Sequence, residues 1–292
     1  MDKHITFLSD GVTVKSTYGS EGKILSVEGI ASNETDHNVI DTPFMPGSQT
    51  NSIRDKQRFI TMQILVPKVM RSYYLHFFRI NSYGQMTVKY GDVERFIEYI
   101  ISASTVDQPT VCQDPVLTLT FRCAYPYFKD VDGFGENLGE KIPLIWPGFL
   151  GVPNRPIVAA YTKFDRYYPI SNVGEVPVGI YVRIRTTGTV KNPRIMLTDT
   201  NMFIKVGTAN NPVAITKDDL LEISTVTENG NLPDSGKDAY VRLNGVNILN
   251  KTDQFSTFFQ IAPGEHSISY DADDGAETLQ VWLWRNWAWS WV

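Results

Sequence analysis

The side chains best able to carry out acid–base or metal chemistry are four histidines, His4, His37, His76 and His266. No two of them stand four residues apart, the spacing that puts two zinc ligands on one helix face. The sequence also lacks a Gly-x-Ser-x-Gly nucleophile turn and a Gly-Lys-Ser/Thr phosphate loop. Because neither a nucleophile with its base nor a phosphate cradle can be assembled, the sequence predicts a protein that is not an enzyme and binds no cofactor.

Two acidic stretches resemble calcium-binding loops only in their first half. In residues 130–135, carboxylates stand at the first and third positions and a glycine at the sixth, as such loops require. The twelfth position should hold a glutamate, but it is Lys141 here, and it is Trp282 for the second stretch, residues 271–275. We therefore interpret both stretches as solvated turns and predict no metal site.

Charge and hydropathy exclude further classes. Lysine and arginine number 27, and aspartate and glutamate number 32, which gives a formal net charge of −5. Nucleic-acid binding relies on a basic surplus that neutralises phosphates, so we predict no specific nucleic-acid binding. No apolar run approaches ~18 residues, and residues 1–6 lack the apolar core of a signal peptide, so we predict no membrane span and no secretion. We interpret Cys112 and Cys123 as free, buried thiols of a protein made in a reducing cytoplasm.

The end of the chain is unusual because five of the 6 tryptophans lie there, namely Trp282, Trp284, Trp287, Trp289 and Trp291. A two-residue turn at 285–286 would place all five on one side of a hairpin, whereas a bulge in one long strand would split them across two faces. Three uses stay open: core and subunit contact, a platform on which sugar rings stack, and a membrane-interface anchor. So large an aromatic patch should be covered in part by a partner.

The elements that position these residues are mostly strands. Residues 59–66 form a predicted strand that ends at Pro67. Residues 68–80 change to a helical period and are the one clear helix of the first half. Its apolar face consists of Val69, Tyr73, Phe77 and Ile80, with Met70, Tyr74 and Phe78 beside them. Residues 31–57 are polar and interrupted by prolines, which indicates a long loop or an extended arm.

A stretch dense in glycine and proline, residues 126–156, marks a domain boundary because such a composition does not sustain a regular element. The sequence therefore predicts an N-terminal domain over residues 1–135, a connector over residues 136–156 and a second domain over residues 157–292.

The second domain is predicted to consist of seven or eight short strands separated by turn residues, which is typical of a jelly-roll β-sandwich. One strand alternates so that a single face carries Val178, Ile180, Val182 and Ile184. Asn244-Gly245 stands between two short strand-like runs and predicts a tight hairpin, since both central residues of such a turn adopt positive φ.

Short motifs occur along nearly the whole chain, and their order is more specific than any one of them. They occupy residues 45–47, 58–60, 121–130, 172–174, 178–185, 192–195 and 262–268. In residues 121–130 a strand is followed by a Cys-Ala turn, a proline, two aromatic residues and a Lys-Asp pair. Taken together, these motifs resemble the distal tail proteins of long-tailed phages. The tryptophan-rich end beyond Arg285 departs from that pattern.

The resemblance implies a mainly β fold, with an N-terminal split β-barrel that carries one helix and a C-terminal galectin-like sandwich. It implies a structural protein of the virion, located at the tail tip or baseplate, whose N-terminal domains form a ring that is typically hexameric. The implied partners are the chain itself, the tail tube protein, the tape measure protein, the tail-associated hub protein and a receptor-binding protein or tail fibre. The genome would pass through this ring during ejection.

An alternative function is a carbohydrate-binding adsorption module, in which the C-terminal sandwich recognises a host surface glycan through Trp287, Trp289 or Trp291. Similarity to sugar-binding folds is not in itself evidence of sugar binding. The alternative is compatible with the ring, because one domain can assemble while the other binds.

Overall fold

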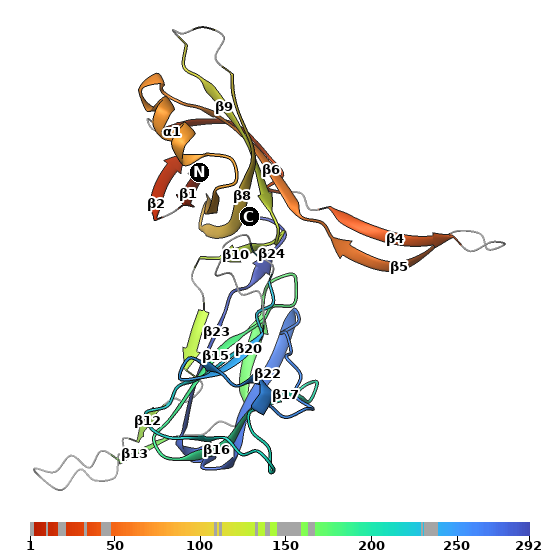
Figure 1. The fold of residues 1–292 in the computed structure, drawn as a ribbon, viewed down its shortest axis with the longest axis vertical. Coiled ribbons are helices and arrows are strands. Elements are labelled where there is room, and N and C mark those ends of the chain that lie inside the picture. The colour runs from red at the N-terminus through yellow and green to blue at the C-terminus, as the bar shows by residue number, and fades with distance from the viewer. Residues whose placement is uncertain are drawn as a thin grey trace, which may run out of the picture. The chain divides into compact units, whose positions relative to one another are not determined.

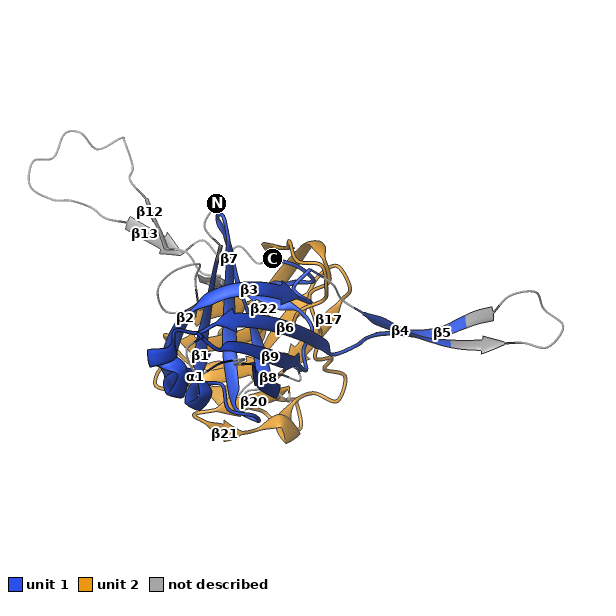
Figure 2. Cartoon of the chain, turned by 90° about the horizontal axis from the view of Figure 1, so that it is seen from above, with its two compact units in different colours: residues 1–132, 227–237, 287–292 blue, residues 133–226, 238–286 orange. Residues whose placement is uncertain are grey.

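The computed structural model describes residues 3–9, 11–16, 22–31, 34–41, 48–107, 110, 113–131, 134–137, 141–144, 159–162, 167–228, 230 and 239–292. The chain divides into two compact units (Figure 2). Unit 1 comprises residues 1–132, 227–237 and 287–292, and unit 2 comprises residues 133–226 and 238–286. The last six residues, which the sequence analysis assigned to the second domain, therefore lie in unit 1.

An antiparallel sheet forms the body of unit 1, in the order β2-β1-β7-β8-β9-β6-β3 (Figure 1). Its strands are β1 (Lys3–Ser9), β2 (Val12–Ser16), β3 (Lys23–Glu28), β6 (Arg58–Leu65), β7 (Tyr83–Tyr90), β8 (Val93–Asp107) and β9 (Val116–Cys123). The edge strands β2 and β3 do not pair with each other in the described residues, so the sheet is a split barrel rather than a closed one. The predicted mainly β fold is confirmed.

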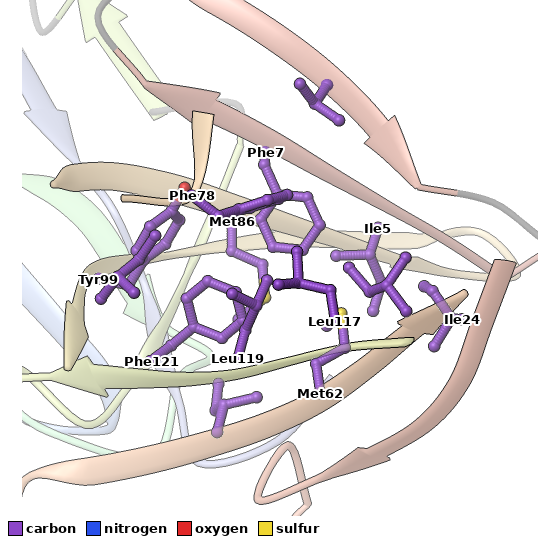
Figure 3. Close-up of a cluster of buried hydrophobic side chains, with 14 of the residues drawn as sticks. Ile5, Phe7, Ile24, Met62, Phe78, Met86, Tyr99, Leu117, Leu119 and Phe121 are labelled. Carbon is purple, nitrogen blue, oxygen red and sulfur yellow. The ribbon is translucent and has the colours of Figure 1, made fainter. Parts of the chain in front are cut away.

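Alternation along the strands creates the core of unit 1. On β6, Ile60, Met62 and Ile64 are buried while the residues between them face outward or are half-buried. The centre is aromatic (Figure 3): the ring centres of Phe7 and Phe78 lie 5.1 Å apart edge to face, and those of Phe7 and Phe121 lie 5.5 Å apart in a stacked arrangement. Such ring pairs contribute beyond the area that they bury.

The predicted helix exists but is shorter than residues 68–80. A 3₁₀ turn, η1 (Lys68–Met70), leads into α1 (Arg71–Phe77). The predicted apolar face is only partly buried: Phe77 and its neighbours Tyr74 and Phe78 are buried, whereas Val69 and Ile80 are 93% and 56% exposed. Because α1 begins only at Arg71, Val69 lies outside it and cannot belong to its buried side. The buried side is the one whose residues contact the aromatic core.

Unit 2 contains two antiparallel sheets that form the predicted sandwich, one in the order β11-β23-β15-β19-β20-β21 and the other in the order β14-β22-β16-β17, with β18 beside β16. The strands of the first sheet are β11 (Phe134–Asn137), β15 (Tyr181–Thr186), β19 (Leu221–Ser224), β20 (Tyr240–Leu243), β21 (Val246–Asn247) and β23 (Leu279–Arg285). Those of the second are β14 (Tyr168–Asn172), β16 (Val190–Leu197), β17 (Met202–Lys205), β18 (Ala214–Ile215) and β22 (Gly264–Asp274).

Two local predictions for unit 2 are confirmed. The face made of Val178, Ile180, Val182 and Ile184 is buried, each residue being at most 1% exposed. Asn244 and Gly245 adopt φ values of 51° and 80° and connect β20 to β21, so this two-residue turn has the positive φ values that its sequence predicts.

Strands also occur within the predicted connector, residues 136–156. The end of β11 lies there, and β12 (Lys141–Leu144) pairs with β13 (Ala159–Thr162). Two short 3₁₀ turns, η2 (Leu249–Lys251) and η3 (Ala276–Thr278), complete unit 2. Residues 145–156 lie outside the described residues.

The turn that follows β3 gives a stability prediction. Gly29 has a φ of +89°, and a Cβ built on it would lie 2.1 Å from the carbonyl oxygen of Phe59, whereas Gly91, at φ +63°, has no atom within 4 Å of such a Cβ. Gly91→Ala should therefore lower the free energy of unfolding by about 1–2 kcal/mol through backbone strain alone. Gly29→Ala should lower it by about 1–3 kcal/mol more, because the backbone must also move. Urea denaturation followed by circular dichroism compares the two, and equal losses would contradict the packing argument.

Candidate functional site

The end of the chain completes the sheet of unit 1. β24 (Ala288–Trp289) pairs antiparallel with β10 (Phe128–Asp130), so that Trp289 stands opposite Phe128, and β10 in turn pairs with β8. We call residues 287–292 the C-terminal segment. Trp287 and Ala288 are 7% and 0% exposed, whereas Trp291 is 47% exposed, so the segment is buried where it begins and reaches the surface near its end. A ladder this short makes few backbone hydrogen bonds, and side chains must supply the remaining stabilisation.

Two arginines, Arg58 and Arg95, stabilise the C-terminal segment. We call this pair the arginine clamp. Arg58 is 3% exposed, and its two terminal nitrogens donate to the carbonyl oxygens of Ile30 at 2.7 Å and Ser290 at 2.6 Å. Arg95 donates to the carbonyl oxygen of Trp291 at 2.6 Å. Hydrogen bonds from a charged donor are shorter and stronger than neutral ones, so two main-chain carbonyls of the C-terminal segment are firmly held.

Aromatic rings cover both guanidinium groups. The central carbon of the Arg95 guanidinium lies 3.9 Å from the ring centre of Trp289 and 5.0 Å from that of Trp291. The corresponding carbon of Arg58 lies 5.0 Å from the ring centre of Phe128. The guanidinium plane suits such stacking, and the attraction grows as water is excluded. Two of the five candidate tryptophans, Trp289 and Trp291, therefore stack on Arg95 of their own chain.

Acidic side chains offset part of this buried positive charge. Asp130 lies 3.5 Å from Nε of Arg95 and accepts a hydrogen bond from the indole nitrogen of Trp289 at 3.1 Å. Lys129, 9% exposed, forms ion pairs with Glu98 and Glu228. Asp130 is the first residue of one calcium-loop candidate, and its contacts with Arg95 and Trp289 account for its position without a metal ion.

The last residue of the chain reaches the open seam of the split barrel. Val292 packs against the core of unit 1 and borders a groove of about 360 Å³. The groove also contacts β3, β1 and β7, through residues such as Ile24, Ile5 and Val88. The C-terminal segment therefore runs from the β10 edge of unit 1 to this seam.

The five tryptophans are divided between the two units. Trp282 and Trp284 lie on β23 in unit 2, half-buried on the side of that strand opposite its buried residues, whereas Trp287, Trp289 and Trp291 lie in unit 1. Both open alternatives are wrong: β23 pairs with β11 and β15, β24 pairs with β10, and the strand of unit 2 ends at Arg285. Each set instead belongs to a different sheet.

The predicted extended arm is a β-hairpin made of β4 (Thr35–Asp41) and β5 (Ser48–Asp55), which projects from the body of unit 1 (Figure 2). Ile53 on this ribbon is 65% exposed. A cleft of about 550 Å³ lies at the base, lined by charged side chains of both signs that include Glu34, Arg54, Asp55 and Arg58. A two-stranded ribbon is marginally stable alone in water, so the arm needs a surface to pack on. Its tip, residues 42–47, lies outside the described residues.

Other chemistry is sparse in the described part of the chain. The histidines do not gather with other ligating residues there, and no group of three or more histidine, cysteine or acidic residues suits a metal ion. His266 contacts Asp199 and the carbonyl oxygen of Ala262 in unit 2, as a packed surface histidine does. Cys123 is a buried free thiol, as predicted, and Cys112 lies outside the described residues. Of the helices that are described, none is long and apolar enough to cross a membrane.

Comparison with known proteins identifies the kind of domain. Residues 173–282 match the family described as siphovirus-type tail component, C-terminal domain. No curated protein sequence matches the chain. The fold resembles that of the SPP1 Dit protein, described as a paradigm of the hub adsorption apparatus in phages that infect Gram-positive bacteria. That similarity has a TM-score of 0.64 at 12% identity and covers 97% of this chain and 98% of the other.

A chain of the phage P2 baseplate in its calcium-activated conformation has a similar fold, with a TM-score of 0.53 at 10% identity over 100% of both chains. A chain of the same baseplate with strontium has a TM-score of 0.51 at 10% identity, over 99% of both chains. At these identities the structural likeness establishes the fold, while residues 173–282 are similar in sequence to the C-terminal domain of a siphovirus-type tail component. The resemblance to distal tail proteins seen in the sequence is thus confirmed.

The arginine clamp gives a second prediction. Arg95→Ala should lower the free energy of unfolding by about 2–4 kcal/mol, because a charged hydrogen bond and a desolvated cation–π contact are lost together. Arg95→Lys keeps the charge but loses the planar fork, so it should cost less stability than Arg95→Ala but still be measurably destabilising in thermal and urea unfolding. Arg71→Ala, at an exposed position of α1, is the matched control and should change stability by less than about 0.5 kcal/mol. An Arg95→Ala variant as stable as this control would contradict the role of Arg95.

The thiol next to the clamp gives a third prediction. Cys123 stands opposite Arg58 across β9 and β6, and burial raises the pKa of its thiol from 9.0 to about 12. Only the thiolate reacts with iodoacetamide, so in a Cys112→Ser background Cys123 should stay unreactive at pH 8 and become reactive in urea. Because the folded thiol keeps its proton as pH rises past 9 while the unfolded one loses it, this group favours unfolding at alkaline pH.

Truncation after Asn286 removes the partner of Arg58 and should increase the labelling rate of Cys123 in the native state. The rate for the full-length Cys112→Ser chain in buffer is the reference. Folded full-length protein that reacts as fast as a free thiol would contradict the burial argument.

Proposed function

We propose that the chain is a distal tail protein, a structural component of a phage tail whose copies form a hexameric ring at the tail tip. The observation that carries this proposal is the match of residues 173–282 to the C-terminal domain of a siphovirus-type tail component. The whole-chain similarity to the SPP1 Dit fold supports it, because both units are present in both proteins. The role is architectural rather than catalytic.

The arm supports self-assembly. It projects from unit 1, and its side chains at residues 34–38, 50 and 52–55 are exposed. When the arm of one copy packs on a neighbour, the contact joins two different surfaces, and such head-to-tail contacts close into rings. The mixed charges at the arm base, with Glu34 and Asp55 near Arg54 and Lys56, suit recognition of a polar surface on that neighbour.

In the proposed assembly the ring joins the tail tube and tape measure protein on one side to the tail-associated hub protein on the other. A receptor-binding protein or tail fibre would attach through unit 2. Six chains with a net charge of −5 each carry about −30 in total. Residual negative charge along the channel would repel DNA and let the genome slide during ejection.

The fourth prediction concerns the assembled mass. The purified chain should form particles of six 33.0 kDa chains, about 198 kDa, in native mass spectrometry. Ile53→Asp introduces a charge on the arm and should raise the protein concentration needed for assembly at least about tenfold. Val246→Asp is the matched control, because Val246 is a strand residue of unit 2 that is also 65% exposed, and it should assemble normally.

A wild-type chain that stays at 33.0 kDa at high concentration would contradict the ring. Rings that form equally well from the Ile53→Asp variant would contradict the role of the arm.

A further inference from the structure

One face of unit 2 gathers aromatic and charged side chains that the proposed hub role does not use. Strand register places them in two neighbouring rows across β23, β15, β19 and β20, which are consecutive in the sheet. The first row consists of Trp284, Tyr181, Ser224 and Tyr240. The second row consists of Trp282, Arg183, Glu222 and Arg242. The alternate residues of these strands, such as Val182, Ile223 and Leu283, are buried in the sandwich, so both rows lie on the opposite side of the sheet. Ser224 is buried on that side too, at 4% exposed, so the accessible part of the face is formed by the other members of the rows.

Contacts within this face hold its side chains in place. The ring centres of Tyr181 and Trp284 lie 5.6 Å apart, and the guanidinium carbon of Arg183 lies 5.3 Å from each of them. Nε of Arg183 donates to the hydroxyl oxygen of Tyr181 at 2.8 Å, and that hydroxyl donates to Glu222. Burial and the hydrogen bond to Glu222 raise the pKa of Tyr181, so the hydroxyl keeps its proton at neutral pH. Groups held in this way lose little freedom when a ligand arrives.

Arg183 is held in place by hydrogen bonds through its Nε atom alone among the described residues. Its side chain is 46% exposed, and within the described residues only its Nε takes part in hydrogen bonds. Its two terminal nitrogens make no hydrogen bond to the described residues and can donate, as a pair, to neighbouring oxygens of a ligand. Arg242 lies 4.2 Å from the ring centre of Tyr240 and is likewise exposed, which places a second guanidinium two strands away.

The charge of the face differs in sign from that of the chain. Arg183, Arg242 and Arg185, which stands opposite Gln280 on the same side of β15, outnumber the single acidic residue Glu222. This gives the face a formal charge of about +2 in a chain whose net charge is −5. An anionic ligand therefore complements it.

We propose that this face binds an anionic polysaccharide. Pyranose rings would stack their C–H sides on Trp284 and Tyr181, while Glu222 and the free nitrogens of Arg183 take up hydroxyl groups. Acidic groups of the polymer, carboxylate or phosphate, would pair with Arg242 and Arg185. The two rows cross four strands, a width of roughly 14 Å at ~4.8 Å per strand, which exceeds a single sugar ring.

The chemistry favours a sugar polymer over a protein partner. The centre of a protein–protein interface is apolar and depleted of charge, whereas the two rows contain aromatic and charged residues and one serine, with no aliphatic side chain. The proposal concerns unit 2 alone and rests on the proposed function only for the expectation that a tail component meets a cell surface. It also moves the sugar platform considered in the sequence from Trp287, Trp289 and Trp291 to Trp284 and its neighbours.

The test is isothermal titration of the purified full-length chain with four defined polymers. Polygalacturonate carries carboxylates on sugar rings, phosphomannan carries phosphates on sugar rings, dextran is a neutral sugar polymer, and polyglutamate is an anionic polymer without sugar. We expect binding to polygalacturonate, phosphomannan or both, at least about tenfold tighter than to dextran or polyglutamate. Which of the two acidic sugars binds distinguishes the carboxylate from the phosphate as the recognised group.

Two variants test the face, each with a matched control in unit 2. Trp284→Ala and Arg183→Ala should each weaken binding at least about tenfold, the loss typical of a residue central to an interface. Phe255→Ala removes an aromatic ring that is 71% exposed elsewhere in unit 2, and Arg194→Ala removes an exposed arginine on β16 of the other sheet. Both controls should bind within about twofold of wild type. Circular dichroism and thermal unfolding verify that all four variants are folded.

Three outcomes would overturn the proposal: no binding of either acidic polysaccharide, equal binding of polyglutamate, or equal losses in the variants and their controls. Native mass spectrometry of the same samples reports the ring separately. A chain that assembles but binds no polysaccharide refutes the sugar site and leaves the hub role intact. A chain that binds the polysaccharide but does not assemble refutes the ring and leaves the sugar site intact.

Discussion

Two buried guanidinium groups keep the end of this chain in the unit that contains its beginning. Arg58 and Ser290 are 232 residues apart in sequence, yet their hydrogen bond is 2.6 Å long. Because β24 is only two residues long, its ladder with β10 depends on these side chains. Unit 2 is consequently inserted within unit 1, since the chain leaves unit 1 after residue 132 and rejoins it at residues 227–237 and again at residue 287.

Arg58 also connects this closure to the arm. One of its nitrogens holds the carbonyl oxygen of Ile30, just before the arm begins, another holds Ser290, and its side chain lines the cleft at the arm base. A single residue thus fixes the start of the proposed ring contact and the end of the chain. An arm that must fit a neighbour benefits from a rigid base, because fewer degrees of freedom are lost on assembly. The sugar-binding face proposed for unit 2 contains neither residue of this clamp.

Local patterns in the sequence predicted local structure well. The alternation from Val178 to Ile184 identified a buried strand face. Asn244-Gly245 identified the turn between β20 and β21. Both features depend on residues that are close in sequence. The helical period identified the apolar residues of the helix but did not show which of them are buried. The aromatic core formed by remote strands selects Tyr74 and Phe78 and leaves Val69 exposed. The tryptophans show the same limit: their alternation predicted shared faces, but Trp289 pairs with β10 and stacks on Arg95, and a buried arginine has no signature in a sequence.

The central claim is that copies of this chain are the segments of a closed ring. Electron microscopy of the purified full-length protein, with averaging of single particles without imposed symmetry, tests it most directly. The account predicts closed rings with six equivalent segments around a central channel. Particles of single-chain size at high protein concentration, or open filaments in place of rings, would contradict it.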